Sequence, residues 1–176
     1  MRKTINCFIP YEENTAIDKV VAALKDSIVV NKIYLLTTAH GSMPSVPAGC
    51  EPFTIDSLNS SDTIKKIAQK ADTPFTLLYT KASPFELGYM ALERIADFLQ
   101  DRKTGMVYAD HYEWKEGEKK KHPAIDYQPG SVRDDFDFGA LLAFRSEYLI
   151  GAAGMMENER EDYRYAGLYA TRLFIA

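Results

Sequence analysis

Polar side chains follow each of the first five short apolar runs of the sequence, and their types suit a nucleotide bearing phosphates. They are Tyr11, Glu12, Thr38, Asp56, Lys81 and Asp110, and Pro10, which directly precedes Tyr11, belongs to the same candidate site. An aromatic ring can lie against a base, carboxylates can accept from ribose hydroxyls, and a lysine can neutralise phosphate. Because α/β sheets bind ligands beyond the C-terminal ends of their strands, the pattern predicts one shared nucleotide site. The alternative is that these are the ordinary polar loops of an α/β domain.

Phosphate-binding glycine loops are absent from the sequence. Neither G-x-G-x-x-G nor G-x-x-x-x-G-K-[ST] follows any apolar run, which argues against nicotinamide dehydrogenases and P-loop enzymes. No G-x-S-x-G motif supplies the nucleophile of a serine hydrolase either. A nucleotide would therefore be held by individual side chains.

Apolar runs alternate with helical patterns, which indicates an α/β fold with a mixed, mainly parallel sheet flanked by helices. Strands are predicted at residues 5–9, 33–38, 53–55, 75–79, 106–109 and 141–144. Helices are predicted over 15–28, from Ser61 or Asp62, after Pro84, and over 163–175. Thr15 with Asp18 has the spacing of a capping box, and the 116–118 stretch predicts a turn followed by solvated lysines.

The bulk composition is that of one globular domain over residues 1–176, with 46% hydrophobic and 26% charged residues. A formal net charge of -4 argues against a nucleic-acid partner. Two cysteines make neither a zinc site nor a disulfide framework. We expect a cytoplasmic protein, because no long apolar segment opens the chain. The last helix ends without a terminating residue, so we also expect the N-terminal part of a longer protein.

Several motifs, taken in order, resemble those of family 2 glycosyltransferases, which have the GT-A fold. Residues 6–11 are similar to the family's first strand and Pro-Tyr loop, and residues 106–113 to its V-Y-x-D strand. Asn59, residues 75–79 and Ser83 with Pro84 keep the family's order. Residues 140–145 resemble the acceptor-side strand, and Gly151 with residues 154–157 resembles the glycine–phenylalanine–acid turn that follows it. The resemblance covers nearly the whole chain.

This resemblance implies sugar transfer from a UDP- or GDP-linked donor to a glycan or a lipid-linked acceptor. The setting would be bacterial cell-surface polysaccharide synthesis, in the cytoplasm or peripheral to the inner face of the membrane. Tyr11 and Glu12 would border the base and ribose, and Asp56 would meet the uracil or ribose. Asp162, or its neighbour Glu161, would be the catalytic base.

Two of these assignments have structural alternatives. Glu161 and Asp162 precede the last helix, where acids commonly stabilise the positive end of a helix dipole. Trp114 is the candidate acceptor contact, because sugar rings present apolar C–H faces to flat aromatic rings. Phe136 and Phe138 could also contact a sugar, but packing in the hydrophobic core explains these two residues equally well.

The metal-binding motif departs from the family pattern. Thr37 and Thr38 stand where the family has an acid, and residues 79–82 replace its D-x-D ligands. Lys81 cannot ligate Mg²⁺ or Mn²⁺, but it could neutralise the diphosphate directly. We therefore assign no metal ligand.

Two other acidic groups have the letters or the spacing of a cation site. Residues 135–137 read as D-x-D but follow the fifth strand at a distance, so a solvated loop or pairing with Arg133 is the favoured interpretation. Asp110, His111 and Glu113 have spacing that could hold a cation, although an exposed strand end is the commoner state.

Two other functions share this architecture. One is an inactive GT-A-like binding or scaffolding domain of a larger protein, since the usual acids are missing. The other is nucleotidyl transfer onto a sugar phosphate, which would call for a glycine-rich segment after the first strand.

Overall fold

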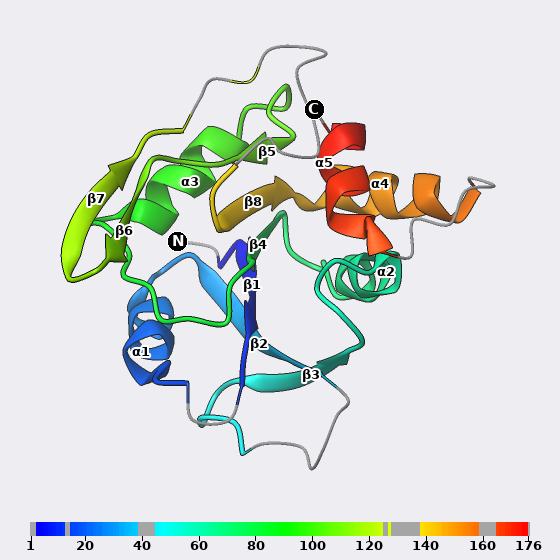
Figure 1. The fold of residues 1–176 in the computed structure, drawn as a ribbon. Coiled ribbons are helices and arrows are strands. Elements are labelled where there is room, and N and C mark those ends of the chain that lie inside the picture. Colours follow the sequence, from blue (N-terminus) through cyan, green and yellow to red (C-terminus); the bar gives the residue numbers. More distant parts are fainter. Residues whose placement is uncertain are drawn as a thin grey trace.

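A six-stranded sheet with helices on both faces forms the body of the computed structural model (Figure 1). The structure describes residues 3–12, 15–38, 45–124, 127, 138–158 and 165–175. The strand order is β3-β2-β1-β4-β8-β5, and a separate two-stranded sheet is formed by β6 and β7.

Four neighbouring strands run parallel: β3 (Glu51–Ile55), β2 (Val30–Thr38), β1 (Ile5–Pro10) and β4 (Phe75–Tyr79). The next strand, β8 (Leu141–Arg145), is antiparallel to β4, and β5 (Met106–Val107) is antiparallel to β8. The C-terminal ends of β1 to β5 therefore lie at one edge of the sheet, where β8 begins. This confirms the predicted α/β fold with a mixed, mainly parallel sheet.

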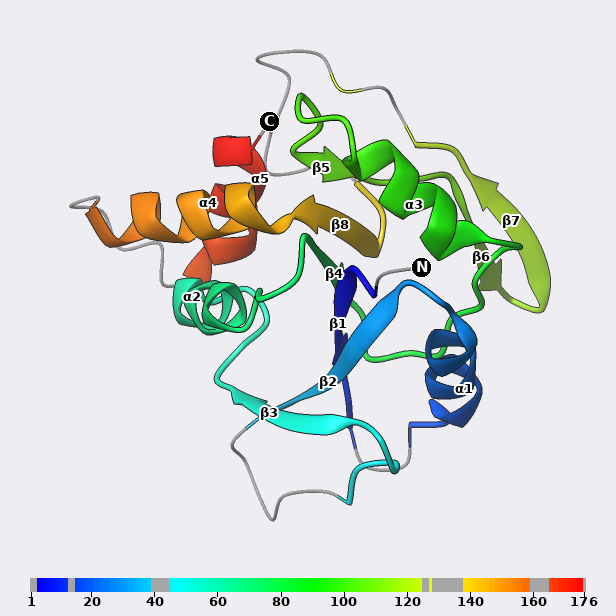
Figure 2. The same cartoon turned by 180° about the vertical axis from the view of Figure 1, so that it is seen from behind.

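Helices from the described ranges cover the two faces of the sheet (Figures 1 and 2). One face carries α1 (Asp18–Asp26) and α3 (Ala91–Leu99). The other carries α2 (Ser61–Gln69), α4 (Ser146–Asn158) and α5 (Gly167–Ile175). Both faces are thus buried, which explains why the central strands are almost continuously apolar.

Alternation along β1 divides its side chains between two cores. Cys7 and Ile9 pack with α1 and α3, whereas Phe8 points to the opposite face and packs with α2 and α4. Phe8 also stacks on Tyr34, with ring centroids 4.7 Å apart. Burial raises the pKa of the Cys7 thiol, so this cysteine acts as a small apolar side chain.

Asn6 is the polar exception in β1, and its amide is completely buried. Its Nδ2 donates to the Lys70 carbonyl oxygen at 3.0 Å and to Asp72 Oδ1 at 2.6 Å. Its Oδ1 accepts from Asn31 Nδ2 at 3.0 Å. The side chain thereby ties β1 to the end of α2 and to β2, at the edge where the strands begin.

The order of elements agrees with the sequence prediction as far as β5, but the starts of α1, α2 and α3 differ from it. The capping box of Thr15 and Asp18 is wrong: Ile17 is the N-cap residue of α1, and no side chain caps it. In α2 the N-cap is Ser60, whose Oγ accepts from the Asp62 N–H at 3.2 Å. Ser61 is instead buried inside the helix.

The prediction that Pro84 opens a helix is also wrong. Residues 80–90 are not helical, and α3 begins at Ala91, after Met90 in the left-handed region at φ 50°. Within α3, the apolar side chain of Phe98 is 62% exposed and lies outside the core. The prediction failed because apolar residues in the loop before α3 and in α3 itself happen to have the spacing of one longer helix.

The sequence interpretation missed α4 altogether. Gly151 and Gly154 lie within this helix and form no turn. Glycine is a poor helix former, and β8 passes into α4 without a loop residue to mark the boundary. Packing of α4 against α2 and α5 stabilises it instead.

The last helix is described from Gly167. A Cβ atom on Gly167 would lie 2.4 Å from the Ser61 backbone nitrogen, so only glycine fits where α5 crosses the start of α2. Within the described part of the chain, no helix is long and apolar enough to span a membrane.

The hairpin formed by β6 (His111–Lys115) and β7 (Glu118–His122) confirms the predicted turn. Its two turn residues, Glu116 and Gly117, both have positive φ, which matches the twist of a tight hairpin. The lysines at 119–121 are exposed, as expected, although they form β7 itself.

Candidate functional site

The end of β4 is fixed to the start of β8 at the edge where the parallel strands end. The Thr80 N–H donates to the Ala140 carbonyl oxygen at 2.8 Å, and Thr80 Oγ1 donates to the same oxygen at 3.1 Å. These bonds continue the antiparallel pairing of Tyr79 with Leu141. Lys81 is the next residue and therefore leaves the sheet at the edge where α/β sheets generally bind their ligands.

The β6–β7 hairpin supplies a partner for Lys81. Lys81 Nζ lies 2.8 Å from Glu113 Oε1, across a sequence separation of 32 residues. Lys115 Nζ lies 3.0 Å from the other oxygen of the same carboxylate, and His111 Nε2 lies 3.6 Å from Oε1. We call Lys81, His111, Glu113 and Lys115 the Glu113 cluster.

Electrostatics in the Glu113 cluster favour the ionised carboxylate. Hydrogen bonds from Lys81 and Lys115 lower the pKa of Glu113 from its ordinary value to about 2. The side chain of Glu113 is 22% exposed, and both lysines are more exposed than that. The cluster is therefore accessible to a dissolved anion.

Asp110 and His122 adjoin the cluster. Asp110 accepts from the Ala124 N–H at 2.7 Å and lies 3.5 Å from Lys121 Nζ, and these contacts lower its pKa. The rings of His111 and His122 stack at 4.7 Å. Gly139 has φ +77°, and a Cβ there would lie 3.2 Å from His111 Nδ1. The base of the hairpin thus packs closely against the residues that precede β8.

The β1 and β3 side of the same edge carries the other predicted ligand-binding residues. Pro10 ends β1, and the half-buried Tyr11 follows it, with its N–H donating to the Leu36 carbonyl at 2.8 Å. The Tyr11 hydroxyl donates to the Ser45 carbonyl oxygen at 3.3 Å. Three further predicted residues, all exposed, lie at this edge: Glu12, Thr38 and Asp56.

Trp114 is 72% exposed on β6. Because successive residues of a strand point to opposite sides, it faces away from its neighbour Glu113. Tyr112 shares its face of the hairpin and has Lys119 Nζ 4.6 Å above its ring. An acceptor lying against Trp114 would therefore be on the opposite face of the hairpin from the Glu113 cluster.

The remaining predicted residues fall outside the described residues. These are the candidate bases Glu161 and Asp162, together with Arg133, Asp135, Phe136 and Asp137. Phe138 is described and is a core residue, with its ring edge-on to Tyr108 at 5.0 Å.

The alternative that Asp110, His111 and Glu113 hold a cation is not supported. Across the described ranges, no three His, Cys, Asp or Glu side chains are grouped as metal ligands. The physical reason is that the two carboxylates have other partners. Glu113 pairs with lysines, and Asp110 pairs with Lys121 and accepts a hydrogen bond from a backbone N–H.

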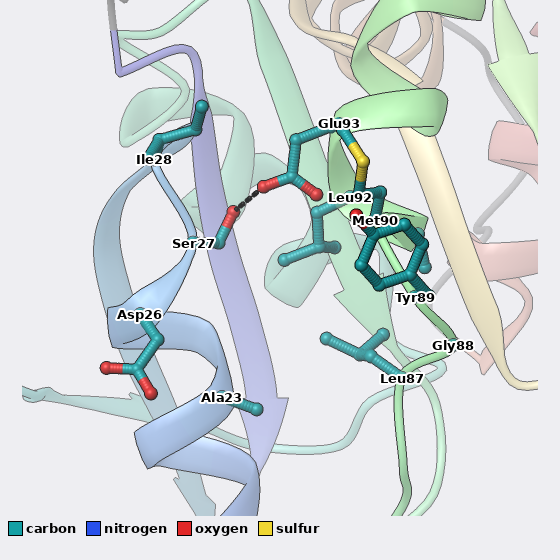
Figure 3. Close-up of a pocket in the computed structure, with 11 residues that line it drawn as sticks. Ala23, Asp26, Ser27, Ile28, Leu87, Gly88, Tyr89, Met90, Leu92 and Glu93 are labelled. Atoms are coloured by element: carbon teal, nitrogen blue, oxygen red, sulfur yellow. Dashed lines mark hydrogen bonds between the residues drawn. The ribbon is translucent and has the colours of Figure 1, made fainter.

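Two surface cavities differ in their relation to this site. One, of about 500 Å³, lies at the opposite edge of the sheet, between the end of α1 and residues 87–93 (Figure 3). Ser27 Oγ donates to Glu93 Oε1 at 2.7 Å across it, and Tyr89 and Met90 line it. The other, of about 410 Å³, follows β5 from Met106 to Asp110 and so reaches the predicted site.

Sequence reasoning missed Lys115, His122 and Gly139 as parts of this site. The predicted turn at 116–118 could have indicated two of them, Lys115 and His122. A tight turn there sets the register that pairs Lys115 with Glu118 and His111 with His122. No sequence pattern indicated that Gly139 would lie against His111.

No family model matches this chain, and no curated protein does. Several solved structures are similar to it, and two of them match it over nearly its whole length. One is 2-C-methyl-D-erythritol 4-phosphate cytidylyltransferase from Thermus thermophilus, with 13% identity, a TM-score of 0.54, and coverage of 98% of this chain and 86% of the other. The second is CMP:2-keto-3-deoxy-manno-octonic acid synthetase complexed with CTP, with 10% identity, a TM-score of 0.55, and coverage of 99% and 87%. At such identities the likeness establishes the fold, which is that of nucleotidyltransferases and is GT-A-like.

Proposed function

We propose that this chain is a GT-A-type glycosyltransferase domain similar to family 2, which transfers a sugar from a nucleoside-diphosphate donor to a glycan or lipid-linked acceptor. The observation that carries the proposal is the set of residues at one edge of the sheet. Tyr11, Asp56 and Lys81 follow β1, β3 and β4, whose C-terminal ends share that edge. The fold likeness to a synthetase solved with CTP supports a nucleotide ligand.

The donor's parts match these side chains in charge and shape. Tyr11 offers a ring for the base, while Glu12 and Asp56 offer acceptors for ribose or uracil. Lys81 offers a positive charge for the diphosphate, and three more residues border the same ligand: Pro10, Thr38 and Asp110. As the bond to the sugar breaks, negative charge grows on the departing diphosphate, and a fixed cation lowers the energy of that step.

The acceptor needs a base to remove its hydroxyl proton. We assign this role to Asp162, with Glu161 as the alternative, on the family resemblance alone. Trp114 is the proposed acceptor contact. Because it faces away from the Glu113 cluster, it would contact a part of a large glycan or lipid-linked substrate that lies away from the reacting hydroxyl. A bacterial setting in polysaccharide synthesis, at the inner face of the membrane, belongs to the same proposal.

Nucleotidyl transfer is the second candidate, because one of the similar structures named above is a cytidylyltransferase and the other is a synthetase complexed with CTP. Against it, the segment after β1 begins Tyr11-Glu12 and contains no glycine before α1. The two reactions differ in their products. A nucleotidyltransferase uses a nucleoside triphosphate and a sugar phosphate and releases pyrophosphate, whereas a glycosyltransferase releases a nucleoside diphosphate.

Calorimetric titration tests the donor site. UDP, GDP, their sugars and CTP are each titrated with and without Mn²⁺, into the wild type and into Lys81→Ala. We expect binding of a nucleoside diphosphate that Lys81→Ala weakens at least about tenfold, the scale of one charge-assisted hydrogen bond. Lys19→Ala, which changes an exposed lysine of α1, should leave it unchanged. Binding of CTP alone would favour nucleotidyl transfer, and no binding of any nucleotide would favour a scaffolding domain.

Turnover tests the proposed base. Transfer of a labelled sugar to a glycan acceptor should be abolished in Asp162→Asn, while donor affinity stays close to that of the wild type. A fully active variant would remove Asp162 from the mechanism.

A further inference from the structure

One carboxylate lies among several nitrogen-bearing side chains beyond the end of β4. Glu113 contacts Lys81 at 2.8 Å, Lys115 at 3.0 Å and His111 at 3.6 Å. These groups come from two elements, since Lys81 follows β4 and the others belong to β6. A single negative charge therefore holds three side chains around one point.

The composition of the Glu113 cluster makes this point suitable for an anion. Its two lysines share one carboxylate. An anion with more charge and more oxygens than a carboxylate would satisfy the lysines better, because charge-assisted hydrogen bonds to phosphate oxygens are strong and lysine offers three donors. The exposure of both lysines leaves the site open to solvent.

We propose that Glu113 competes with a diphosphate group for Lys81 and Lys115, and that a bound diphosphate displaces the carboxylate from both lysines. This rests on the proposed function, in which Lys81 meets the donor diphosphate. The carboxylate has two consequences. It keeps the lysines converged before the ligand arrives, and it lowers the affinity of the ligand for them.

The competition predicts the direction in which affinity for a diphosphate changes when Glu113 is replaced. Replacing Glu113 by glutamine keeps the shape of the side chain but removes its charge, so the lysines lose their internal competitor. Affinity for a diphosphate should then rise about tenfold, which is the scale of one charge-assisted hydrogen bond. A purely structural role predicts the reverse, because loss of the carboxylate would let the lysines disperse.

The experiment titrates inorganic pyrophosphate and UDP into the wild type, Glu113→Gln, Glu147→Gln and Lys115→Gln by calorimetry at two salt concentrations. Glu147 is an exposed residue of α4 at the opposite edge of the sheet, so its variant makes the same change in net charge away from the cluster. We expect tighter binding only in Glu113→Gln, weaker binding in Lys115→Gln, and smaller differences at high salt. Unchanged or weaker binding in Glu113→Gln, or an equal gain in Glu147→Gln, would overturn the inference.

Pyrophosphate and UDP together separate this inference from the proposed function. If Glu113→Gln binds pyrophosphate more tightly than the wild type does, and UDP binds no more tightly than pyrophosphate, the anion site stands and the nucleotide proposal fails. If UDP binds equally well to the wild type, Glu113→Gln and Lys115→Gln, the anion site is refuted and the nucleotide site lies elsewhere along the edge.

Discussion

The centre of the sheet and the β6–β7 hairpin are built from opposite kinds of residue. In β1 and β4 nearly every side chain is buried and apolar, and both faces are covered by helices. In the hairpin most side chains are exposed, and charged groups from two elements hold it to the sheet edge. Burial therefore supports the fold, whereas exposed charge shapes the candidate site. Substitutions in the two regions should change different properties.

The largest expected effect is that of Leu77→Ala in β4. Leu77 is completely buried, and removing its side chain leaves a cavity that lowers the free energy of unfolding by about 3 kcal/mol. Urea denaturation followed by circular dichroism measures this loss. Leu77→Met nearly conserves volume and should cost less than about 1.5 kcal/mol. A loss below about 1 kcal/mol for the alanine variant would contradict the picture of a packed centre.

Gly167→Ala tests the crossing of α2 and α5. The new Cβ would lie 2.4 Å from the Ser61 nitrogen, so the helices must separate, at a cost of about 2 kcal/mol. Gly151→Ala in α4 is the control, because no atom lies within 4 Å of a Cβ there and alanine is the better helix former. We expect Gly151→Ala to raise the unfolding midpoint slightly, and a shift in the same direction for both variants would refute the close crossing.

Asn6→Ala removes the buried amide of β1. Its hydrogen bonds to Lys70, Asp72 and Asn31 would be lost, and the unpaired groups cost about 1.5 kcal/mol. Thermal unfolding measures the change, with the exposed Asn59→Ala as a surface control. If Asn6→Ala proves neutral, water replaces the lost partners and this network adds no stability.

Glu113→Gln should have the smallest effect on stability, and its size depends on pH. The pKa of Glu113 is about 2 in the folded protein and near its ordinary value of 4.5 when unfolded. Because the pKa of Glu113 is lower in the folded protein, the ion pairs stabilise the fold fully at pH values above the pKa of the unfolded state. This contribution is lost as the pH falls towards the pKa of the folded state. The unfolding midpoints of wild type and variant should therefore converge in acid. A large difference at neutral pH that persists near the folded pKa would show that Glu113 acts through packing.

Local patterns in the sequence were enough to place the strands of the six-stranded sheet and the helices other than α4, but not β6 and β7. Continuous apolar runs indicated β1, β2 and β4, and the helical apolar stripe over Val20, Val21 and Leu24 indicated α1. These signals are local, because period and hydrophobicity are read from neighbouring residues. For the same reason the sequence also indicated that polar residues follow several strands and share an edge.

Other features depend on contacts between residues far apart in the chain, and no local pattern marks them. They are the antiparallel insertion of β8 between β4 and β5, the helix α4 across two glycines, and the contact of Lys81 with Glu113. Ion pairs of exposed side chains leave no periodic pattern, since their energy comes from distance in space. Hydrophobicity along the chain therefore predicted the fold, whereas the arrangement of charge at its edge required the positions of the atoms.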